Sequence, residues 1–205
     1  DLIAVPDFAM GAMENVGAVT FRETLLLIDV EKATRSELSR SISVIAHELA
    51  HMWFGDLVTM DWWDGIWLNE AFASLMEVIA SEATYPEFKL WNEMNQDRSR
   101  GFGVDSLKSS RPVEFEVKSP EEAEEMFDVL TYQKGSTVLR MFETFIGEEN
   151  FKKGVRSYLN KYEYKNTHSS DLWNELTNSS SYNLSEILPT WIKQEGYPIV
   201  KIEKV

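Results

Sequence analysis

A run of apolar residues in the first quarter of the chain constrains the fold most, because its spacing is helical. The residues recur at intervals of four, three, four and three, as Leu38, Ile42, Ile45, Leu49 and Met52. This period defines one face of an amphipathic helix. Ser36 precedes the run as a typical helix N-cap, and Gly55 follows it as a typical helix end. The sequence therefore predicts a helix between these two residues.

Two of the three histidines in the chain lie on this expected helix. His47 and His51 are four residues apart, and residues at that spacing share one face of a helix. Both imidazoles can therefore point to one place, as two ligands of a tetrahedral Zn²⁺ must. Glu48 lies one residue round the helix, where a general base can take a proton from water activated by the metal.

A third ligand is needed before this pattern indicates a metal site. The pattern H-E-x-x-H recurs by chance, and these residues could merely decorate an amphipathic helix. Glu70 lies on a second expected helix after a short connection, so it can complete a His₂Glu site with His47 and His51. Asn69 is a candidate hydrogen-bond partner for a ligating histidine, and Glu77 on the same helix is another.

The rest of the chain predicts an α+β fold, in which a small β region leads into a mostly helical body. Residues 1–30 favour strands in LIAVPDF and GAVTFRETLLLID, because both segments are rich in β-branched and large apolar residues. The helical body covers about 36–195, and residues 98–115 within it read as a loop-rich passage. Further helices are expected at NEAFASLMEVIASEA, SPEEAEEMF, GSTVLRMFETFIG, ENFKKGVRSYLNKY, SSDLWNELTN and LSEILPTWIKQ.

Charge and composition exclude several classes of function. The chain has 34 acidic and 20 basic residues and a net charge of −14. Binding to nucleic acid is not expected, because a basic surplus is needed to displace counterions from phosphates. The absence of cysteine excludes disulfides and thiolate metal sites. No apolar stretch is long enough for a membrane segment, and the first residues lack the pattern of a signal peptide.

Three motifs, in this order, resemble those of the gluzincin zinc aminopeptidases, which share a thermolysin-like catalytic domain. The motifs are G-A-M-E-N, then H-E-x-x-H followed by Glu, then Y-x-K-G. The resemblance covers nearly the whole chain and is nearest to archaeal and bacterial members. The matching residues are Gly11, Ala12, Met13, Glu14 and Asn15 for the first motif, His47, Glu48, His51 and Glu70 for the second, and Tyr132, Gln133, Lys134 and Gly135 for the third.

The resemblance implies a role for the matched side chains. One Zn²⁺ would be bound by the two histidines and Glu70, with Glu48 as general base. Tyr132 would donate a hydrogen bond to the oxyanion of the tetrahedral intermediate, although without the resemblance a core tyrosine is the simpler interpretation. Glu14 would pair with the free α-ammonium group of a peptide and so place the cut one residue from its N-terminus. The other residues of G-A-M-E-N would line the same cleft, with Met10 as a candidate for one wall.

The resemblance also implies that this chain is an excised catalytic domain. Residues 1–197 would form that domain, and residues 198–205 would begin a following β domain. The expected partners are peptides with a free N-terminus and the N- and C-terminal domains of a longer protein, in a cytoplasmic location. We expect the isolated piece to bind zinc but to hydrolyse peptides poorly, because the other domains complete the cleft. The preferred N-terminal residue and the oligomeric state do not follow from the sequence.

Three other functions fit part of the pattern. A thermolysin-type endopeptidase uses the same metal chemistry, but it has no need of an anchor such as Glu14. A non-catalytic zinc- or peptide-binding module would have no need of Glu48 or Tyr132. An epoxide hydrolase activity, known in one branch of the family, ranks lowest. The remaining conspicuous residues are expected to be structural: His168 and the run Glu121–Glu125 at the surface, and Trp62, Trp63 and Trp67 packed around the link between the metal helices.

Overall fold

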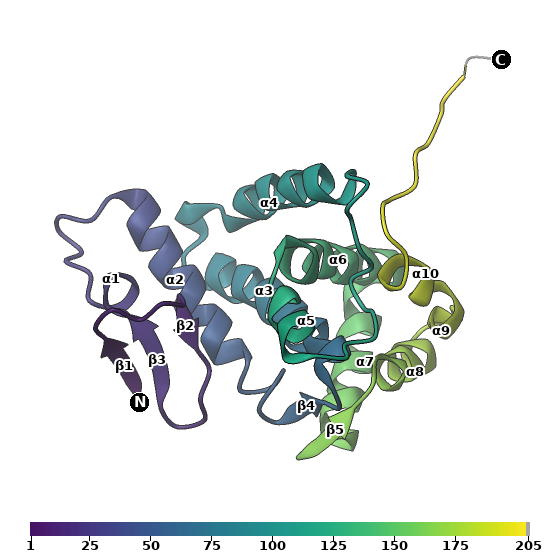
Figure 1. The fold of residues 1–205 in the computed structure, drawn as a ribbon, viewed down its shortest axis with the longest axis horizontal. Helices are drawn as coiled ribbons and strands as arrows, with labels where there is room; N and C mark the ends of the chain where they lie inside the picture. The colour runs from purple at the N-terminus through teal and green to yellow at the C-terminus, as the bar shows by residue number, and fades with distance from the viewer. Residues whose placement is uncertain (204–205) are drawn as a thin grey trace.

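The computed structural model describes residues 1–203, as a small sheet beside a larger helical body (Figure 1). The sheet contains β1 (Leu2–Val5), β2 (Ala12–Met13) and β3 (Val19–Arg22), in the order β1-β3-β2. β1 runs parallel to β3, and β2 runs antiparallel to it. This arrangement confirms the predicted α+β class and carries the G-A-M-E-N segment to one edge of the sheet.

The strand predicted to continue to residue 29 ends earlier, at Arg22. Glu23–Leu26 form the short helix α1 instead. The side chain of Arg22 donates hydrogen bonds to the carbonyls of Phe8 and Ala9, and the Leu25 carbonyl accepts one from Ser41. Leu25 itself is buried. The chain therefore turns here: the turn buries the Leu25 side chain and lets its carbonyl accept a hydrogen bond from Ser41 on the first long helix. A strand that continued straight would make neither contact.

The first long helix, α2 (Arg35–Ala50), begins close to the predicted start but ends before the predicted end. Its N-cap is Thr34 rather than Ser36, because Thr34 and Glu37 form a reciprocal capping box. The regular helix ends at Ala50, well before Gly55. His51 is the C-cap, with helical φ and ψ of −60° and −21°, so the spacing of the two histidines is preserved.

The connection to the second long helix contains a strand that the sequence analysis did not predict. β4 (Val58–Met60) pairs in parallel with β5 (Lys165–Thr167), more than a hundred residues away. The 3₁₀ turn η1 (Trp63–Gly65) then leads into α3 (Ile66–Thr84). β4 is short and its ladder partner lies far along the chain, so no local sequence pattern predicts it.

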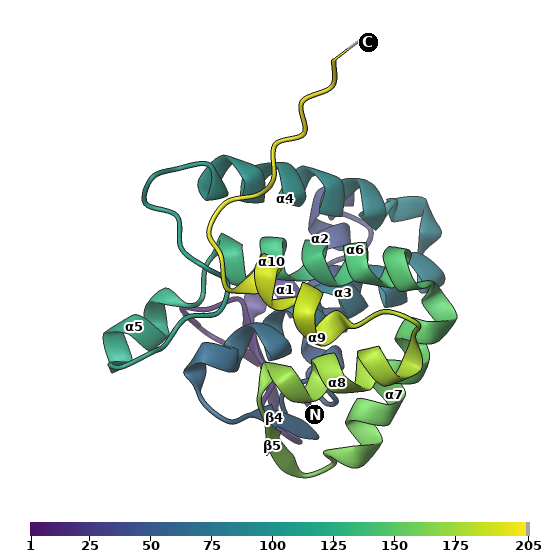
Figure 2. The same ribbon diagram turned by 90° about the vertical axis from the view of Figure 1, so that its right-hand side faces the viewer.

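The remaining helices surround α3 on several sides (Figure 2). The passage 98–115 was expected to be loop-rich, but α4 continues through its first part to Asp105. The last expected helix is divided into two at Pro189. Residues 197–203 form neither helix nor strand, and residues 204–205 lie outside the described part, so the start of a β domain there stays a prediction. The elements are η2 (Pro86–Phe88), α4 (Leu90–Asp105), α5 (Pro120–Glu125), the π-helical turn η3 (Leu130–Lys134), α6 (Gly135–Ile146), α7 (Glu148–Lys161), α8 (Ser169–Ser179), α9 (Leu184–Ile187) and α10 (Pro189–Ile192).

The main core lies where α3 packs against α6, α7 and α8. Trp67 is fully buried there and stacks on Trp173, as predicted for a packing residue. Trp62 and Trp63, which were expected to pack around the link between the metal helices, are instead exposed. The indole N–H of Trp62 donates to the carbonyl of Val117 at 3.0 Å.

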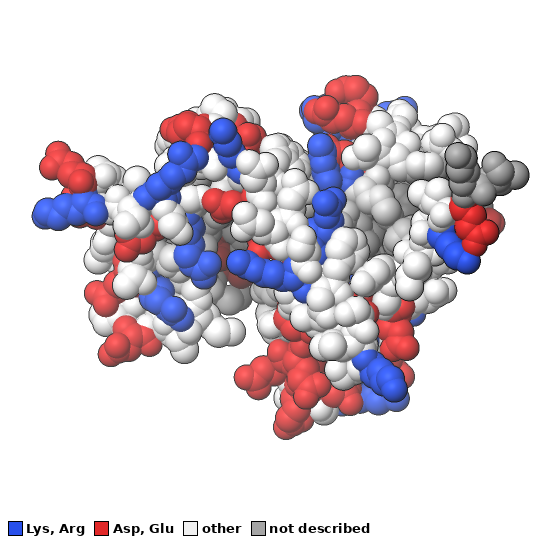
Figure 3. All heavy atoms as spheres, turned by 90° about the horizontal axis from the view of Figure 1, so that it is seen from above, with Lys and Arg blue, Asp and Glu red and all other residues white. Residues whose placement is uncertain are grey.

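Charged residues are distributed as expected for a solvated acidic surface. Acidic and basic side chains are interspersed on the face in Figure 3, and acidic ones gather where α5 projects from the body (Figures 2 and 3). His168 is exposed at the start of α8, 3.5 Å from Asp61. Within the described residues, no helix combines the length and apolar character needed to cross a bilayer.

Candidate metal centre

The residues predicted to bind a metal meet between α2 and α3. His47 Nε2 lies 3.3 Å from Glu70 Oε2, and His51 Nε2 lies 3.4 Å from the same oxygen. Ligand atoms at about 2.0–2.1 Å from a tetrahedral zinc lie about 3.4 Å from one another. The three side chains therefore already have the spacing of a His₂Glu metal site, and they fit this group.

Both histidines are oriented from behind by a second contact. His47 Nδ1 donates to Glu77 Oε2 at 2.8 Å, and His51 Nδ1 donates to the carbonyl of Phe54 at 2.9 Å. A proton on Nδ1 leaves the Nε2 lone pair directed towards Glu70, as a metal ligand requires. Of the two candidates for this orienting contact, Asn69 and Glu77, it is Glu77 that holds His47, and a backbone carbonyl holds His51. The seven-residue spacing of Glu70 and Glu77, about two helical turns, places both carboxylates on one face of the helix.

Without a metal, these side chains compensate one another's charge. Burial alone would lower the pKa of His47, but hydrogen bonds to Glu70 and Glu77 outweigh it and raise the pKa to about 10. Burial alone would raise the pKa of Glu70, but hydrogen bonds from the two histidines lower it to about 2. The pKa of His51 is also raised, because its bond to Glu70 outweighs burial. A bound cation would replace these imidazole protons.

Glu48 lies beside this centre on the same turn of α2. Its side chain is buried, and burial raises the pKa of the carboxyl to about 7, although the nearby histidines oppose the shift. Glu48, His51 and Glu14 each place one polar atom within 4.8 Å of the others. A carboxyl group with a pKa near neutrality can both accept and return a proton, which is the property of a general base.

The G-A-M-E-N segment reaches the centre from the edge of the sheet. Glu14 follows β2 directly, and its Oε1 lies 3.9 Å from His51 Nδ1. The Asn15 amide donates to Thr20 at 3.5 Å, and Asn15 is not among the residues that border the cleft, so its part in substrate binding stays a prediction. The pairing of β2 with β3 therefore fixes Glu14 beside the metal ligands. The segment residues that do line the cleft are Gly11, Ala12, Met13 and Glu14, together with the neighbouring Met10.

Tyr132 faces the same centre from η3. Its ring is stacked on that of His47, with centroids 6.0 Å apart and an angle of 20° between the planes. Burial, with the charge of Glu70 nearby, raises the pKa of the phenol above its usual value. The hydroxyl therefore stays protonated at neutral pH and available as a hydrogen-bond donor.

These side chains border one large cleft between the sheet edge, α2, α3, α4 and η3. Its volume is about 1080 Å³. The cleft is also lined by three arginines that no motif predicted, Arg40, Arg98 and Arg100. In sequence, all three lie well after the G-A-M-E-N segment. They come from two separate helices and belong to no local motif, so no sequence pattern indicates them.

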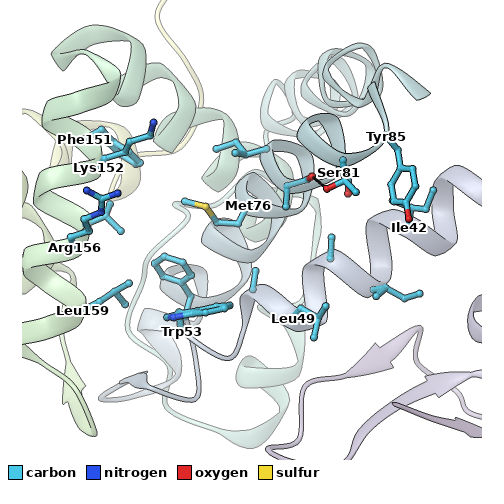
Figure 4. Close-up of a pocket in the computed structure, with 18 residues that line it drawn as sticks. Ile42, Leu49, Trp53, Met76, Ser81, Tyr85, Phe151, Lys152, Arg156 and Leu159 are labelled. Carbon is cyan, nitrogen blue, oxygen red and sulfur yellow. Dashed lines mark hydrogen bonds between the residues drawn. The ribbon is translucent and has the colours of Figure 1, made fainter. Parts of the chain in front are cut away.

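A second hollow lies on the opposite side of α2 and differs in chemistry. It has a volume of about 640 Å³ and lies between α2, α3 and α7 (Figure 4). Its lining is mostly apolar and includes Ile42, Leu49, Trp53 and Met76, and its only charged lining residues are Lys152 and Arg156. Unlike the first cleft, its lining offers no carboxylate or imidazole to a metal.

Comparison with known proteins agrees with this geometry. A probable aminopeptidase 2 from Sulfurisphaera tokodaii is 50% identical over 98% of this chain and 26% of its own length. A leucyl aminopeptidase from Saccharolobus solfataricus is 47% identical over 98% of the chain and 26% of its own. A puromycin-sensitive aminopeptidase from Caenorhabditis elegans is 45% identical over the whole chain and 22% of its own. The chain thus spans about a quarter of the length of these curated relatives.

The family model of the peptidase family M1 domain matches residues 1–191 of this chain, which include all three motifs and every side chain of the centre. The match extends from the small sheet into α10. The chain therefore belongs to peptidase family M1.

Proposed function

We propose that this chain is the catalytic part of a zinc-dependent aminopeptidase. The observation that carries the proposal is the position of Glu14, whose carboxylate lies 3.9 Å from His51 at the edge of the His₂Glu centre. A carboxylate there can hold the free α-ammonium group of a peptide by a charge-assisted hydrogen bond. Relatives at 45–50% identity bear the name aminopeptidase, which supports the same activity.

Each residue of the centre has a distinct part in this reaction. His47, His51 and Glu70 would hold one zinc ion, which when bound activates water and polarises the scissile carbonyl. Glu48 accepts the proton of the attacking water and passes it to the departing amine nitrogen. The Tyr132 hydroxyl donates a hydrogen bond to the oxygen of the former carbonyl as negative charge develops on it. Glu14 holds the substrate amine, so the bond beside the first residue lies at the centre.

The experiment that tests this function compares substrates that differ only at the amine. A panel of aminoacyl amides and short peptides is supplied free and N-acetylated to the full-length zinc-loaded protein. We expect hydrolysis of the free forms only, because acetylation removes the charge that Glu14 pairs with. Glu14→Gln should raise KM for the free forms by about tenfold or more. Equal hydrolysis of acetylated peptides would instead establish an endopeptidase.

The activity of the separate piece is a second part of the proposal. Since the curated relatives are about four times as long, we propose that other parts of the protein complete the cleft. The separated chain should then bind zinc and turn over substrate more slowly than the full-length protein. Equal turnover by the two forms would contradict this part while leaving the aminopeptidase proposal intact. A cytoplasmic location also stays a prediction.

A further inference from the structure

Lys134, the last residue of η3, has a largely covered side chain and pairs with the buried Asp105 at the end of α4. Lys134 Nζ lies 2.8 Å from Asp105 Oδ2, and the two side chains are 10% and 3% exposed. The same ammonium group donates to the carbonyl of Gly196 at 3.0 Å and to that of Gln194 at 3.3 Å. All three of its protons therefore have an acceptor, which is the arrangement that a buried ammonium group requires.

Asp105 extends this contact to two more places. Its Oδ1 accepts a hydrogen bond from Ser110 at 2.7 Å and one from the backbone N–H of Gly196 at 2.9 Å. Gly196 is thus held through both its N–H and its carbonyl. The Lys134–Asp105 pair ties η3 to the end of α4 and to residues 194–196, and the latter are 60 to 91 residues distant in sequence from the residues that hold them.

The other end of η3 is held in a similar way. Asp128 Oδ1 accepts hydrogen bonds from the backbone N–H groups of Leu130 and Thr131, at 2.9 and 3.1 Å. Arg111 pairs with Asp128 at 2.7 Å and also donates to the Thr131 hydroxyl at 3.0 Å. The five residues of η3 therefore lie between two ionic anchors, with Tyr132 in the middle.

The π-helical turn itself needs such support. Five-residue turns of this kind are rare, and they often occur at functional sites. Directly after Lys134, Gly135 approaches α3 so closely that a Cβ there would lie 2.7 Å from the Cβ of Ala71, the neighbour of Glu70. A shift of η3 would therefore change the distance between the Tyr132 hydroxyl and the metal ligands.

We infer that Lys134, through its pair with Asp105, is a positioning residue for Tyr132, and that residues 194–196 belong to the same support. This inference rests on the proposed role of Tyr132 as the donor to the developing oxyanion. It gives the lysine of Y-x-K-G a function, since Lys134 points away from the centre and lies outside the cleft lining. It also connects the donor to the segment from which the chain continues past Gly196.

A double-mutant cycle in the full-length zinc-loaded protein tests this inference. Lys134→Met should lower kcat about tenfold, with KM and zinc content unchanged, because only the oxyanion contact is misplaced. In a Tyr132→Phe background the same change should lower kcat by no more than about twofold, since the donor is already absent. An equal loss in both backgrounds would show a general structural effect and overturn the inference.

A matched control and a second readout keep the test independent of activity. Lys161→Met removes another ion pair of a lysine with a buried carboxylate, Lys161–Glu175 at 2.6 Å between α7 and α8, and should leave kcat unchanged. 3-Fluorotyrosine placed at position 132 alone reports the surroundings of the ring by ¹⁹F NMR. Lys134→Met and Asp105→Asn should shift this resonance, and Lys161→Met should not. If Lys134→Met and Asp105→Asn leave the resonance unshifted, the inference is overturned. If they shift it but the protein without these substitutions shows no aminopeptidase activity, only the proposed function is overturned.

Discussion

The two faces of α2 differ in chemistry and in burial, and the difference is the reverse of the usual one. On one face, Glu48 and His51 are only 6% and 1% exposed, although both are ionisable. On the opposite face, Leu49 and the following Trp53 are 45% and 52% exposed, although both are apolar, and they line the groove in Figure 4. A helix in a typical soluble domain buries its apolar face and exposes its polar one.

The comparison teaches what each kind of surface needs. Buried imidazoles and carboxylates are stable only with partners, and α3 supplies them through Glu70 and Glu77. Exposed apolar side chains cost little individually, so Leu49 and Trp53 need no such partners. The polar face of α2 therefore depends on specific partners from α3, whereas the exposed apolar side chains do not, and substitutions on the two faces should have different consequences.

The largest effect is expected from Glu48→Gln on the polar face. The amide cannot accept the proton of the attacking water, so kcat should fall about a thousandfold. Zinc content should be unchanged, because Glu48 is not among the three ligands. Steady-state kinetics and metal analysis of the same preparation check both statements, and persistent turnover would show that Glu48 is not the base.

A pair of leucines compares the two environments directly. Leu75→Ala on α3 removes a fully buried side chain and should lower the free energy of unfolding by about 2–5 kcal/mol. Leu49→Ala removes one that lines the open groove and should cost about 1 kcal/mol or less. Denaturant unfolding at a fixed zinc concentration measures both. Equal losses would mean that the groove face is covered in solution.

Glu77 tests how far the polar face depends on α3. Glu77→Gln weakens the contact that orients His47, so zinc affinity should fall about 10–100-fold while turnover per bound zinc changes less. Competition with a chelator gives the affinity. Glu82→Gln is the control on the same helix, because Glu82 accepts a backbone hydrogen bond from Leu90 and touches neither histidine. A similar loss in both variants would refute a specific role for Glu77.

The smallest effect is a pH dependence of zinc binding. The pKa of His47 is raised to about 10, so without metal its imidazole is protonated at neutral pH and must lose a proton when zinc binds. Zinc affinity should therefore weaken as pH falls, by at least about tenfold per pH unit around neutrality. Calorimetric titration in two buffers of different ionisation enthalpy detects the released proton. No proton release at pH 7 would contradict the raised pKa.

Much of the site followed from local sequence. The spacing of His47 and His51 predicted two ligands on one helix face, and Glu70 was found from the helix that follows. Asp105 and residues 194–196 were not found, because a buried ion pair between distant segments leaves no periodic signal. The same holds for β4, whose ladder partner lies far along the chain. The strand expected after Arg22 did not form, and α1 formed instead, because the burial of Leu25 outweighed the local β propensity.

The sequence by itself determined that two imidazoles and a carboxylate lie on one turn of a helix, since residue type and helical period place them there, and these are the groups to which we assign the chemistry. It also determined that the fold is α+β with a helical body. Only the tertiary structure decided which face of α2 is buried, how close Glu14 lies to His51, and what holds Tyr132 in place. These depend on contacts between elements far apart in the chain, where packing and the pairing of buried charges decide rather than local conformational preference.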